Sequence, residues 1–496
     1  MDESGLSRTD LGLFLDLGAT DPDQPDYRRL FLALRQAILA RRIEGGARLP
    51  STRALATTLG IARNTVKNAY ELLQAEGYLE GRRGSGCYVV ELPPVEPSDD
   101  RARARDISGA VGPAAAKAAD HGRGGLLQSA VPALDHFPHR RWQRALQAAS
   151  TGSGLPAGDP QGDRQLREEI ARWLGAQRGM RVDAAQVLIT SGSQQGLYLI
   201  ARQLPPGGDP VLLERPGFPG TERAMRLAGA EVRHFHQRDL DQVERLPRAR
   251  LMVLTPSRNF PLGHTLAADR RLALLNRAYE QDLWLVEDDY DSEFAAGPAL
   301  SALYSLDSRE RVIYAGTFSR TLFPGLRIGY LVLPERLVPG FVETRGVIDG
   351  GLSTLPQRAL AEFMACGDYS RHLRRMKRLY QQRRHLLEQL LAQGELRDLR
   401  IIDAGGGMHL CLQLPPGCDD RVVVRRLEAA GVTARGLSRY DDTGGPGLVL
   451  GFAAQGADAL ARGVDILERV VGPLLERGPP GDQITLLKHS NCGGPR

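Results

Sequence analysis

The chain has 496 residues, which exceeds what one ordinary hydrophobic core accommodates, so we expect two or more domains. Hydrophobic residues make up 42% of the sequence and charged residues 25%, and no run approaches the roughly 20 apolar residues of a membrane helix. Five scattered cysteines form no C-x-x-C pair, which argues against a disulfide scaffold or a zinc site. We therefore expect a cytoplasmic protein without a metal.

The positive charge is concentrated near the N-terminus. The net charge of the whole chain is +5, whereas residues 27–86 hold eleven basic and four acidic side chains, a net charge of +7. A short segment that is more positive than the entire chain is typical of a nucleic-acid-binding module.

Three helices are predicted in this basic segment. Apolar residues recur at helical spacing over residues 27–40. Ser51 is placed to cap a second helix, which Gly60 ends. A third helix is expected over residues 62–76. The tight turn between the last two helices predicts a helix-turn-helix.

A basic hairpin follows the third helix. Two short apolar strands, residues 78–79 and 88–90, are joined by the sequence GRRGSG. Helix-turn-helix and hairpin together predict a winged helix-turn-helix domain over residues 20–91. Residues 92–125 are rich in Pro, Ala, Gly and charge, and we interpret them as a flexible linker.

Beyond the linker, short apolar runs alternate with amphipathic segments. The expected strands are residues 187–190, 211–214, 251–255, 283–287, 312–315 and 328–333. Helices over residues 193–203 and 269–281 lie between them. This alternation predicts an α/β fold with a mostly parallel, doubly wound sheet covered on both faces.

The C-terminal third is expected to form a smaller α+β subdomain. One long helical region over residues 358–393 precedes strands at residues 410–414 and 448–452. We place the whole second domain at residues 126–476 and expect a disordered tail over residues 477–496, which has few apolar residues.

The start of the third helix should face base edges in the major groove of DNA. Arg63 can donate two hydrogen bonds to a guanine, and wing arginines can reach the backbone or the minor groove. The candidate DNA contacts, all polar side chains of the last two helices or the wing, are Arg53, Arg63, Asn64, Thr65, Arg82 and Arg83. The alternative is that these side chains form a solvated face.

The stretch LPSTRALATTLGIARNTVKNAYELLQAEGYLEGRRGSGCYV resembles the DNA-binding domain of the GntR family of bacterial transcription regulators. The match extends over residues 27–90 and includes the proline-serine start, the arginine-asparagine-threonine-valine box and the glycine-rich wing.

Three predicted strand ends carry polar chemistry. They are TSGSQQG at residues 190–196, EDDYDSEF at residues 287–294 and GTFSRTLFPGLRIGY at residues 316–330. Ligands of doubly wound sheets bind at strand carboxyl ends, often with a phosphate at a helix N-terminus. Each segment alone is weak, because a serine-glycine-serine is usually a helix cap and an acidic strand end is usually solvated.

In this order, the three segments resemble fold-type I aminotransferases that use pyridoxal phosphate. The resemblance implies that Asp288 pairs with the pyridine nitrogen of the cofactor, Tyr290 binds its phenolic oxygen and Phe218 stacks on its ring. The implied phosphate ligands are Ser191, Gly192, Ser193, Gln194, Ser319 and Arg327. Asn259 is implied to face the ring, although the family's serine-histidine-glutamine box is Ser257-Arg258-Asn259 here.

A GntR-type winged helix joined to an aminotransferase-like domain resembles the MocR subfamily of regulators. That resemblance implies a head-to-tail homodimer that binds double-stranded DNA and a small-molecule effector. It also implies pyridoxal phosphate as the bound group and amino-acid, amine or vitamin B6 metabolism as the regulated pathway.

The sequence departs from the family at Arg320. This position is the family's lysine that forms a Schiff base with the cofactor, and a guanidinium cannot form that imine. Val449 likewise occupies the place of an arginine that grips a substrate carboxylate. Lys377 lies in a pattern typical of a solvated helix face, so it is no substitute. We therefore expect no catalytic residue and only non-covalent binding of pyridoxal phosphate or a related anionic metabolite, with Arg320 in the pocket.

Three readings follow. The leading one is a ligand-responsive, sequence-specific transcription regulator that is not an enzyme. The second is a pyridoxal-phosphate-dependent aminotransferase with an appended DNA-binding domain, against which Arg320 argues. The third is a dimerisation scaffold whose pocket binds nothing.

Overall fold

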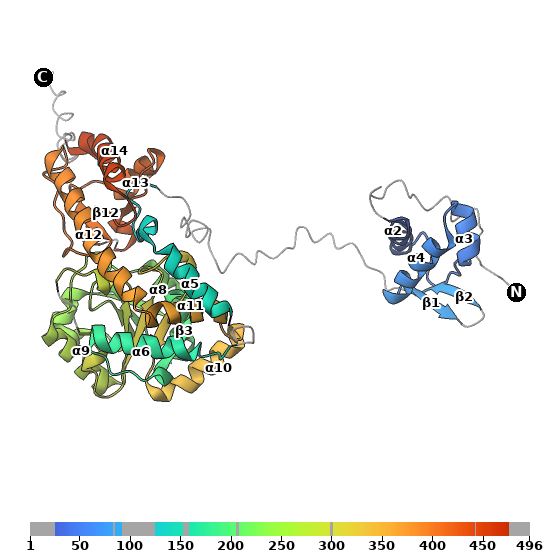
Figure 1. Cartoon of the computed structure of the whole chain (residues 1–496), viewed down its shortest axis with the longest axis horizontal. Helices are drawn as coiled ribbons and strands as arrows, with labels where there is room; N and C mark the ends of the chain where they lie inside the picture. The colour runs from blue at the N-terminus through green and yellow to red at the C-terminus, as the bar shows by residue number, and fades with distance from the viewer. Residues whose placement is uncertain are drawn as a thin grey trace, which may run out of the picture. The chain divides into compact units, whose positions relative to one another are not determined.

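The computed structural model describes residues 25–82, 85–91, 125–151, 158–204, 208–297, 301–441 and 443–475. The chain divides into two compact units, residues 1–118 and residues 119–496, shown in Figure 1. Arg83, the expected linker up to residue 124 and the expected tail over residues 477–496 lie outside the described residues.

Three helices and a hairpin make up the described residues of the first unit. Its elements are α2 (Asp26–Leu39), α3 (Thr52–Leu59), α4 (Arg63–Ala75), β1 (Leu79–Arg82) and β2 (Gly86–Val89). The hairpin is antiparallel, with Leu79 opposite Val89. Leu30, Leu34, Val66 and Leu73 are fully buried and form the core between the helices.

Local signals explain the turn between α3 and α4. The side chain of Ser51 accepts a hydrogen bond from the Ala54 amide at 3.2 Å and caps α3. Gly60 follows α3 with a φ of 67°, a left-handed conformation that glycine adopts at little cost. The predicted winged helix-turn-helix is confirmed.

The second unit is built on a seven-stranded sheet. Its strands are β3 (Val187–Thr190), β4 (Val211–Arg215), β5 (Val232–His236), β6 (Leu251–Leu254), β7 (Trp284–Asp289), β8 (Val312–Thr317) and β9 (Gly329–Val332). Their order is β3-β9-β8-β7-β6-β4-β5. Strand β9 is antiparallel to both of its neighbours and the remaining pairs are parallel. The expected mostly parallel sheet is confirmed.

Helices cover both faces of this sheet. They are α5 (His139–Ser150), α6 (Arg164–Arg178), α7 (Ser193–Gln203), α8 (Pro219–Leu227), α9 (Ala268–Gln281), α10 (Val338–Asp349), α11 (Thr354–Ala365) and α12 (Asp368–Gln393). Leu213 and Val253 pack in one core cluster with α7 and α8, whereas Leu212 and Met252 pack in another with α9. Successive strand residues therefore fill opposite cores, as strand alternation requires. No helix in the described ranges is long and apolar enough to cross a membrane.

A three-stranded antiparallel sheet forms the smaller subdomain. Its elements are β10 (His409–Gln413), α13 (Asp420–Ala429), β11 (Arg435–Gly436), β12 (Gly447–Gly451) and α14 (Ala457–Leu475). Figure 1 shows α12 running along this subdomain beside α14.

Two details differ from the sequence prediction. The helical region expected over residues 358–393 is two helices, because Gly367 adopts a φ of 71° after α11 and α12 starts anew. The edge strand β5 was not predicted, because its sequence VRHFH has only Phe235 buried and lacks a strong apolar run.

Ser51→Ala should lower the free energy of unfolding of the winged helix by about 1 kcal/mol, because an amide at the start of α3 loses its acceptor. Thermal unfolding followed by circular dichroism checks this result. Ser51→Asn, which can still cap, should remain close to the wild type, and equal losses in both variants would contradict the capping role.

Candidate functional site

The three polar segments identified in the sequence meet at one edge of the large sheet. They follow β3, β7 and β8, and these strands run in the same direction because β9 reverses between β3 and β8. Their carboxyl ends therefore lie side by side, at the edge where doubly wound sheets bind ligands.

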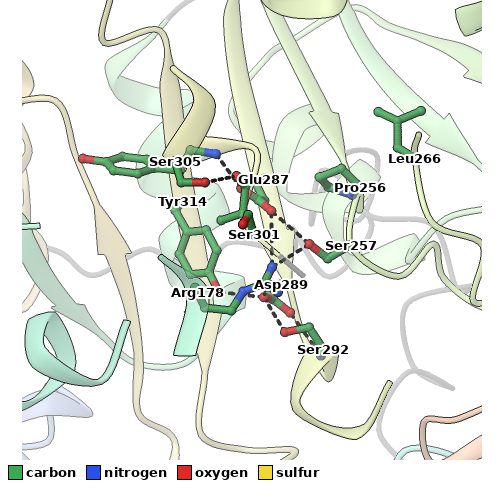
Figure 2. A network of polar contacts seen from close by, with 12 residues as sticks. Arg178, Pro256, Ser257, Leu266, Glu287, Asp289, Ser292, Ser301, Ser305 and Tyr314 are labelled. Atoms are coloured by element: carbon green, nitrogen blue, oxygen red, sulfur yellow. Dashed lines mark hydrogen bonds and ion pairs between the residues drawn. The ribbon is translucent and has the colours of Figure 1, made fainter. Parts of the chain in front are cut away.

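Strand alternation divides the acidic residues of β7 between two faces. Figure 2 shows that Glu287 and Asp289 point toward Arg178, the last residue of α6. The Arg178 guanidinium lies 3.1 Å from the Asp289 carboxylate and 3.6 Å from the Glu287 carboxylate, and all three side chains are almost completely buried. This ion-pair network holds the end of β7 on the face of the sheet opposite Asp288.

Hydroxyl groups complete the network around Arg178. Tyr314 donates to the Asp289 carboxylate at 2.6 Å, and Ser257 donates to the Glu287 carboxylate at 3.2 Å. Burial raises the pKa of Glu287, while Arg178 opposes that shift. Sequence reasoning did not identify Arg178, because no local spacing links the end of α6 to a strand more than one hundred residues later.

Asp288 points away from this network, and one of its carboxylate oxygens has no hydrogen-bond partner among the described residues. It is 8% exposed, and neither its Oδ1 atom nor the buried Tyr290 Oη atom has a hydrogen-bond partner among the described residues. Burial, Asp289 and Glu214 raise the pKa of Asp288 to about 7, against the opposing charge of Arg320. Burial also raises the pKa of Tyr290. Buried unsatisfied groups are costly, which makes these two atoms candidates for ligand contacts.

The N-terminus of α7 is the second polar part of the site. Gly192 precedes this helix with a φ of 74°, and no side chain caps the helix within the described structure. The first amides of α7, from Ser193 and Gln194, therefore point into the site at the positive end of the helix dipole.

Arg327 lies beside this helix start. Its guanidinium donates to the Ser191 carbonyl at 3.1 Å. Gly329 is needed in the same place, since a Cβ atom there would lie 2.8 Å from the Gly192 carbonyl carbon. Ser319 is half-buried, and its amide bonds to Thr317 at 3.2 Å. Two predicted anion-binding segments are thus brought together, and they fit a phosphate group.

Phe218 and Asn259 form the neighbouring wall. Phe218, which is 38% exposed, contacts the edge of Phe260 at a ring distance of 6.2 Å. Asn259 is buried, and its amide donates to the Pro216 carbonyl at 3.3 Å. The Gln194 side chain donates to the Gly220 carbonyl at 2.7 Å, so it fixes the start of α8.

Arg320 extends from the end of β8 into this region. The ionisable groups that act on its pKa are Asp291, Tyr290, Tyr440 and Asp288, and burial lowers that pKa while these groups raise it. Its guanidinium also donates a hydrogen bond to the Ala130 carbonyl.

The segment that contains Ala130 is constrained at both ends. Ala130 and Leu127 both adopt left-handed backbone angles, with φ of 72° and 57°. Leu127 is fully buried, and its amide donates to the Gln455 side chain at 2.9 Å. Residues with side chains adopt such angles at a cost, so surrounding contacts must hold this segment in place.

The departure at Arg258 has a structural explanation. Arg258 is 3% exposed and lies 3.2 Å from the Asp291 carboxylate. It donates to the carbonyls of Gly405 and Gly406, and a Cβ atom on Gly407 would collide with it at 2.3 Å. Arg258 therefore connects the large sheet to the loop before β10.

The side chain of Val449 lies in a hydrophobic cluster. Val449 is fully buried in a cluster with Phe260, Cys411, Leu437 and Tyr440. Of the two lysines within the described ranges, Lys377 donates to the Gly297 carbonyl from α12 and Lys67 belongs to the first unit. Neither is placed at the strand ends.

A cavity of about 210 Å³ adjoins the site. Its lining includes Phe218, Asp288 and two residues that the sequence did not identify, Glu214 and Tyr440. Glu214 accepts hydrogen bonds from the Thr255 amide and hydroxyl at 2.8 and 2.6 Å. A carboxylate at the end of an apolar strand is the signal that marked Asp288, and it could have identified Glu214 as well.

The candidate DNA contacts lie on the first unit. Arg53, Arg63 and Asn64 are exposed, and Thr65 is half-buried at the start of α4. Arg82 lies over the Tyr88 ring at 4.5 Å and donates to Glu80 at 2.8 Å, so part of its charge is engaged on the wing. Within the described ranges, no group of three or more His, Cys, Asp or Glu side chains could hold a metal ion.

Family descriptions match both units. Residues 26–89 match "Bacterial regulatory proteins, gntR family", and residues 126–437 match "Aminotransferase class I and II". Among solved structures, the α-aminoadipate aminotransferase LysN from Thermus thermophilus is 29% identical, with a TM-score of 0.64 over 71% of this chain and 94% of LysN.

Curated relatives match nearly the whole chain. The probable rhizopine catabolism regulatory protein MocR of Rhizobium meliloti is 36% identical over 90% of this chain and 94% of its own length. The pyridoxine biosynthesis regulator PdxR of Corynebacterium glutamicum is 32% identical over 89% of this chain and 95% of its own length. With its GntR-type winged helix joined to an aminotransferase-like domain, the chain belongs to the MocR subfamily of transcription regulators.

Proposed function

We propose that this transcription regulator binds pyridoxal phosphate, or a related anionic metabolite, without a covalent bond and does not catalyse transamination. The observation that carries the proposal is the combination of two unpartnered buried groups, Asp288 and Tyr290, with an arginine at position 320. Asp288 and Tyr290 are the two groups that would bind a pyridoxal ring, whereas Arg320 cannot supply the amine of an imine.

The residues present fit the cofactor. Asp288 would accept a hydrogen bond from a protonated ring nitrogen, which would stabilise the ionised carboxylate. Tyr290 would donate to the phenolic oxygen, and Phe218 would cover the ring. The proposed phosphate ligands are Ser191, Gly192, Ser193, Gln194, Ser319 and Arg327. When bound, pyridoxal phosphate supplies an electron-withdrawing ring and an aldehyde.

The proposed role of Arg320 is electrostatic. A guanidinium remains charged and offers five N–H donors, so it can pair with a phosphate or carboxylate but cannot supply an imine nitrogen. Because Arg320 also bonds to the Ala130 carbonyl, an anion that competes for it would release the segment that follows the expected linker. Such release would connect the pocket to the DNA-binding unit.

Names of relatives support the ligand class. The LysN structure is titled as complexed with N-(5'-phosphopyridoxyl)-L-leucine, a pyridoxyl conjugate of an amino acid. PdxR is named for pyridoxine biosynthesis and MocR for rhizopine catabolism. We infer regulation of amino-acid, amine or vitamin B6 metabolism.

At the DNA end, Arg63, Asn64 and Thr65 are proposed to read bases. Arg53, Arg82 and Arg83 are proposed to contact phosphates. The regulator would act in the cytoplasm as a head-to-tail homodimer.

The proposed domain limits are residues 20–91 for DNA binding and 126–476 for the pocket, joined by residues 92–125. Apolar side chains exposed around the junction of α10 and α11, Val347, Ile348 and Leu355, are available for a subunit contact.

Two alternatives make different predictions. An aminotransferase would show sustained turnover with an amino-acid donor, and none of the curated regulators above is named for such an activity. A dimerisation scaffold would bind DNA with an affinity that no pocket ligand changes. Titrating pyridoxal phosphate into a DNA-binding assay separates the scaffold from the proposed regulator.

Arg320→Lys should convert reversible binding into imine formation, because lysine can supply a neutral amine. After incubation with pyridoxal phosphate and reduction with borohydride, peptide mass spectrometry should find the adduct on residue 320. Arg320→Met is the matched control and should carry no adduct there. A wild-type chain that is modified elsewhere in the pocket would contradict the non-covalent proposal.

Asp288→Asn should flatten the stability profile of the ligand-free chain between about pH 4 and pH 7. The pKa of Asp288 rises from 3.8 to about 7 on folding, so the folded chain retains a proton that the unfolded chain releases in this window. The free energy of unfolding therefore falls as pH rises through the window and stays reduced above it. Asparagine has no carboxylate to ionise, so the variant should be more stable than the wild type at pH 8.

Thermal unfolding at stepped pH measures both effects of this substitution. Asp291 and Glu293, whose pKa values burial raises to about 6 and about 8, are present in both proteins, so the difference reports Asp288. The same variant should lose stabilisation by pyridoxal phosphate. Parallel profiles for the two proteins would show that Asp288 is not the buried titrating group.

Arg63→Ala should relax DNA specificity by roughly 1 to 3 kcal/mol at one base pair, because a bidentate contact to a base edge is lost. Binding of the full chain to a captured genomic fragment and to its single-base variants measures this change. Lys67→Ala, on an exposed later turn of α4, is the control. Unchanged discrimination in Arg63→Ala would place base reading elsewhere.

A further inference from the structure

A strongly basic surface lies on the second unit, apart from both sites above. We call it the α5–α12 basic surface and define it by the exposed side chains of Arg140, Arg144, Arg371, Arg374, Arg375 and Arg378. Residues 139–150 contain three arginines and no acidic residue, and residues 368–378 contain five basic residues and one acidic residue.

One ion pair holds the two helices of this surface together. Asp368, at the start of α12, pairs with Arg141 of α5 and lies 2.6 Å from the Arg371 guanidinium. His136 accepts a hydrogen bond from Arg375 at 3.1 Å. The one acidic residue of segments 139–150 and 368–378 is thus already engaged, and it cannot neutralise the remaining arginines.

Five of the six arginines have no acidic partner. Within the described residues, no carboxylate lies within ion-pairing distance of Arg140, Arg144, Arg374, Arg375 or Arg378. A hollow of about 360 Å³ lies along the α12 side, lined by His136 and by arginines of α12. Like charges gathered on one surface repel one another, and a bound polyanion would relieve that repulsion.

The spacing of these arginines suits a phosphate backbone. Arg371 and Arg378 are seven residues apart on α12, a rise of about 10 Å along one helix face. Phosphates along one DNA strand follow each other at about 3.4 Å of axial rise, so this face covers about three of them. Arginine is suited to such contacts, because its planar guanidinium can donate two hydrogen bonds to one phosphate.

We propose that the α5–α12 basic surface is a second DNA contact, which binds the phosphate backbone without reading sequence. This contact goes beyond the proposed function, in which the winged helix alone touches DNA, and it does not depend on any ligand in the pocket. DNA held by the winged helix is at high effective concentration for the second unit, since 33 residues separate Glu91 from Gly125. A chain of that length spans at most about 110 Å.

The test measures the salt dependence of binding of the full chain to a 60-base-pair duplex of random sequence. Each lost phosphate contact should lower the slope of log K against log salt concentration by about 0.9, so Arg374→Ala/Arg378→Ala should lower it by roughly 2. Arg140→Ala/Arg144→Ala should act in the same direction. Thermal unfolding of both double variants should match the wild type, because the substituted side chains are exposed.

A charge-matched control removes two exposed arginines from other helices, Arg202 of α7 and Arg425 of α13. Arg202→Ala/Arg425→Ala should leave the salt slope at the wild-type value. The proposal is overturned if the surface variants keep the wild-type slope. It is also overturned if they bind DNA more tightly than the wild type.

Discussion

The buried ion pairs of Arg178 with Glu287 and Asp289 hold the end of β7 in place, and the pocket depends on that position. Three consecutive carboxylates could not be buried together without compensation, because each would lose its hydration. Strand alternation separates them, and the cation behind the sheet stabilises the first and the third. Asp288 is thereby left facing the ligand site with an unpartnered oxygen. The candidate site is therefore a consequence of how this strand is anchored.

Two buried or half-buried arginines lie among the other acidic groups of this region. Arg258 pairs with Asp291 and with the loop before β10. Arg320 is charged among Asp288, Asp291 and the two phenols of Tyr290 and Tyr440. A guanidinium places positive charge in the pocket but cannot form an imine. Binding an anion needs that charge, whereas transamination needs an amine that forms the imine.

Much of the fold could be predicted because its signals are local. Ser51 and Gly60 mark the ends of α3, and apolar runs such as residues 187–190 coincide with strands. Strand β5 was not predicted, because an edge strand has few buried residues and therefore no clear apolar run in its sequence. The helical region over residues 358–393 was placed by its apolar spacing, which does not mark the left-handed turn at Gly367.

The site was only partly visible in the sequence for a similar reason. Asp288 and Tyr290 lie in one short segment, but Arg178, Ala130 and Tyr440 reach the same region from distant parts of the chain. No spacing rule connects such residues. The contact from Arg320 to Ala130 is of this kind, and it links the pocket to a segment that follows the expected linker in the sequence.

The most direct test of the central claim is fluorescence anisotropy of the wild-type chain on a captured genomic fragment, titrated with pyridoxal phosphate and then dialysed. A non-covalent sensor predicts a saturable change in DNA affinity that dialysis fully reverses. A change that persists after dialysis, or an affinity that the ligand never alters, would contradict it.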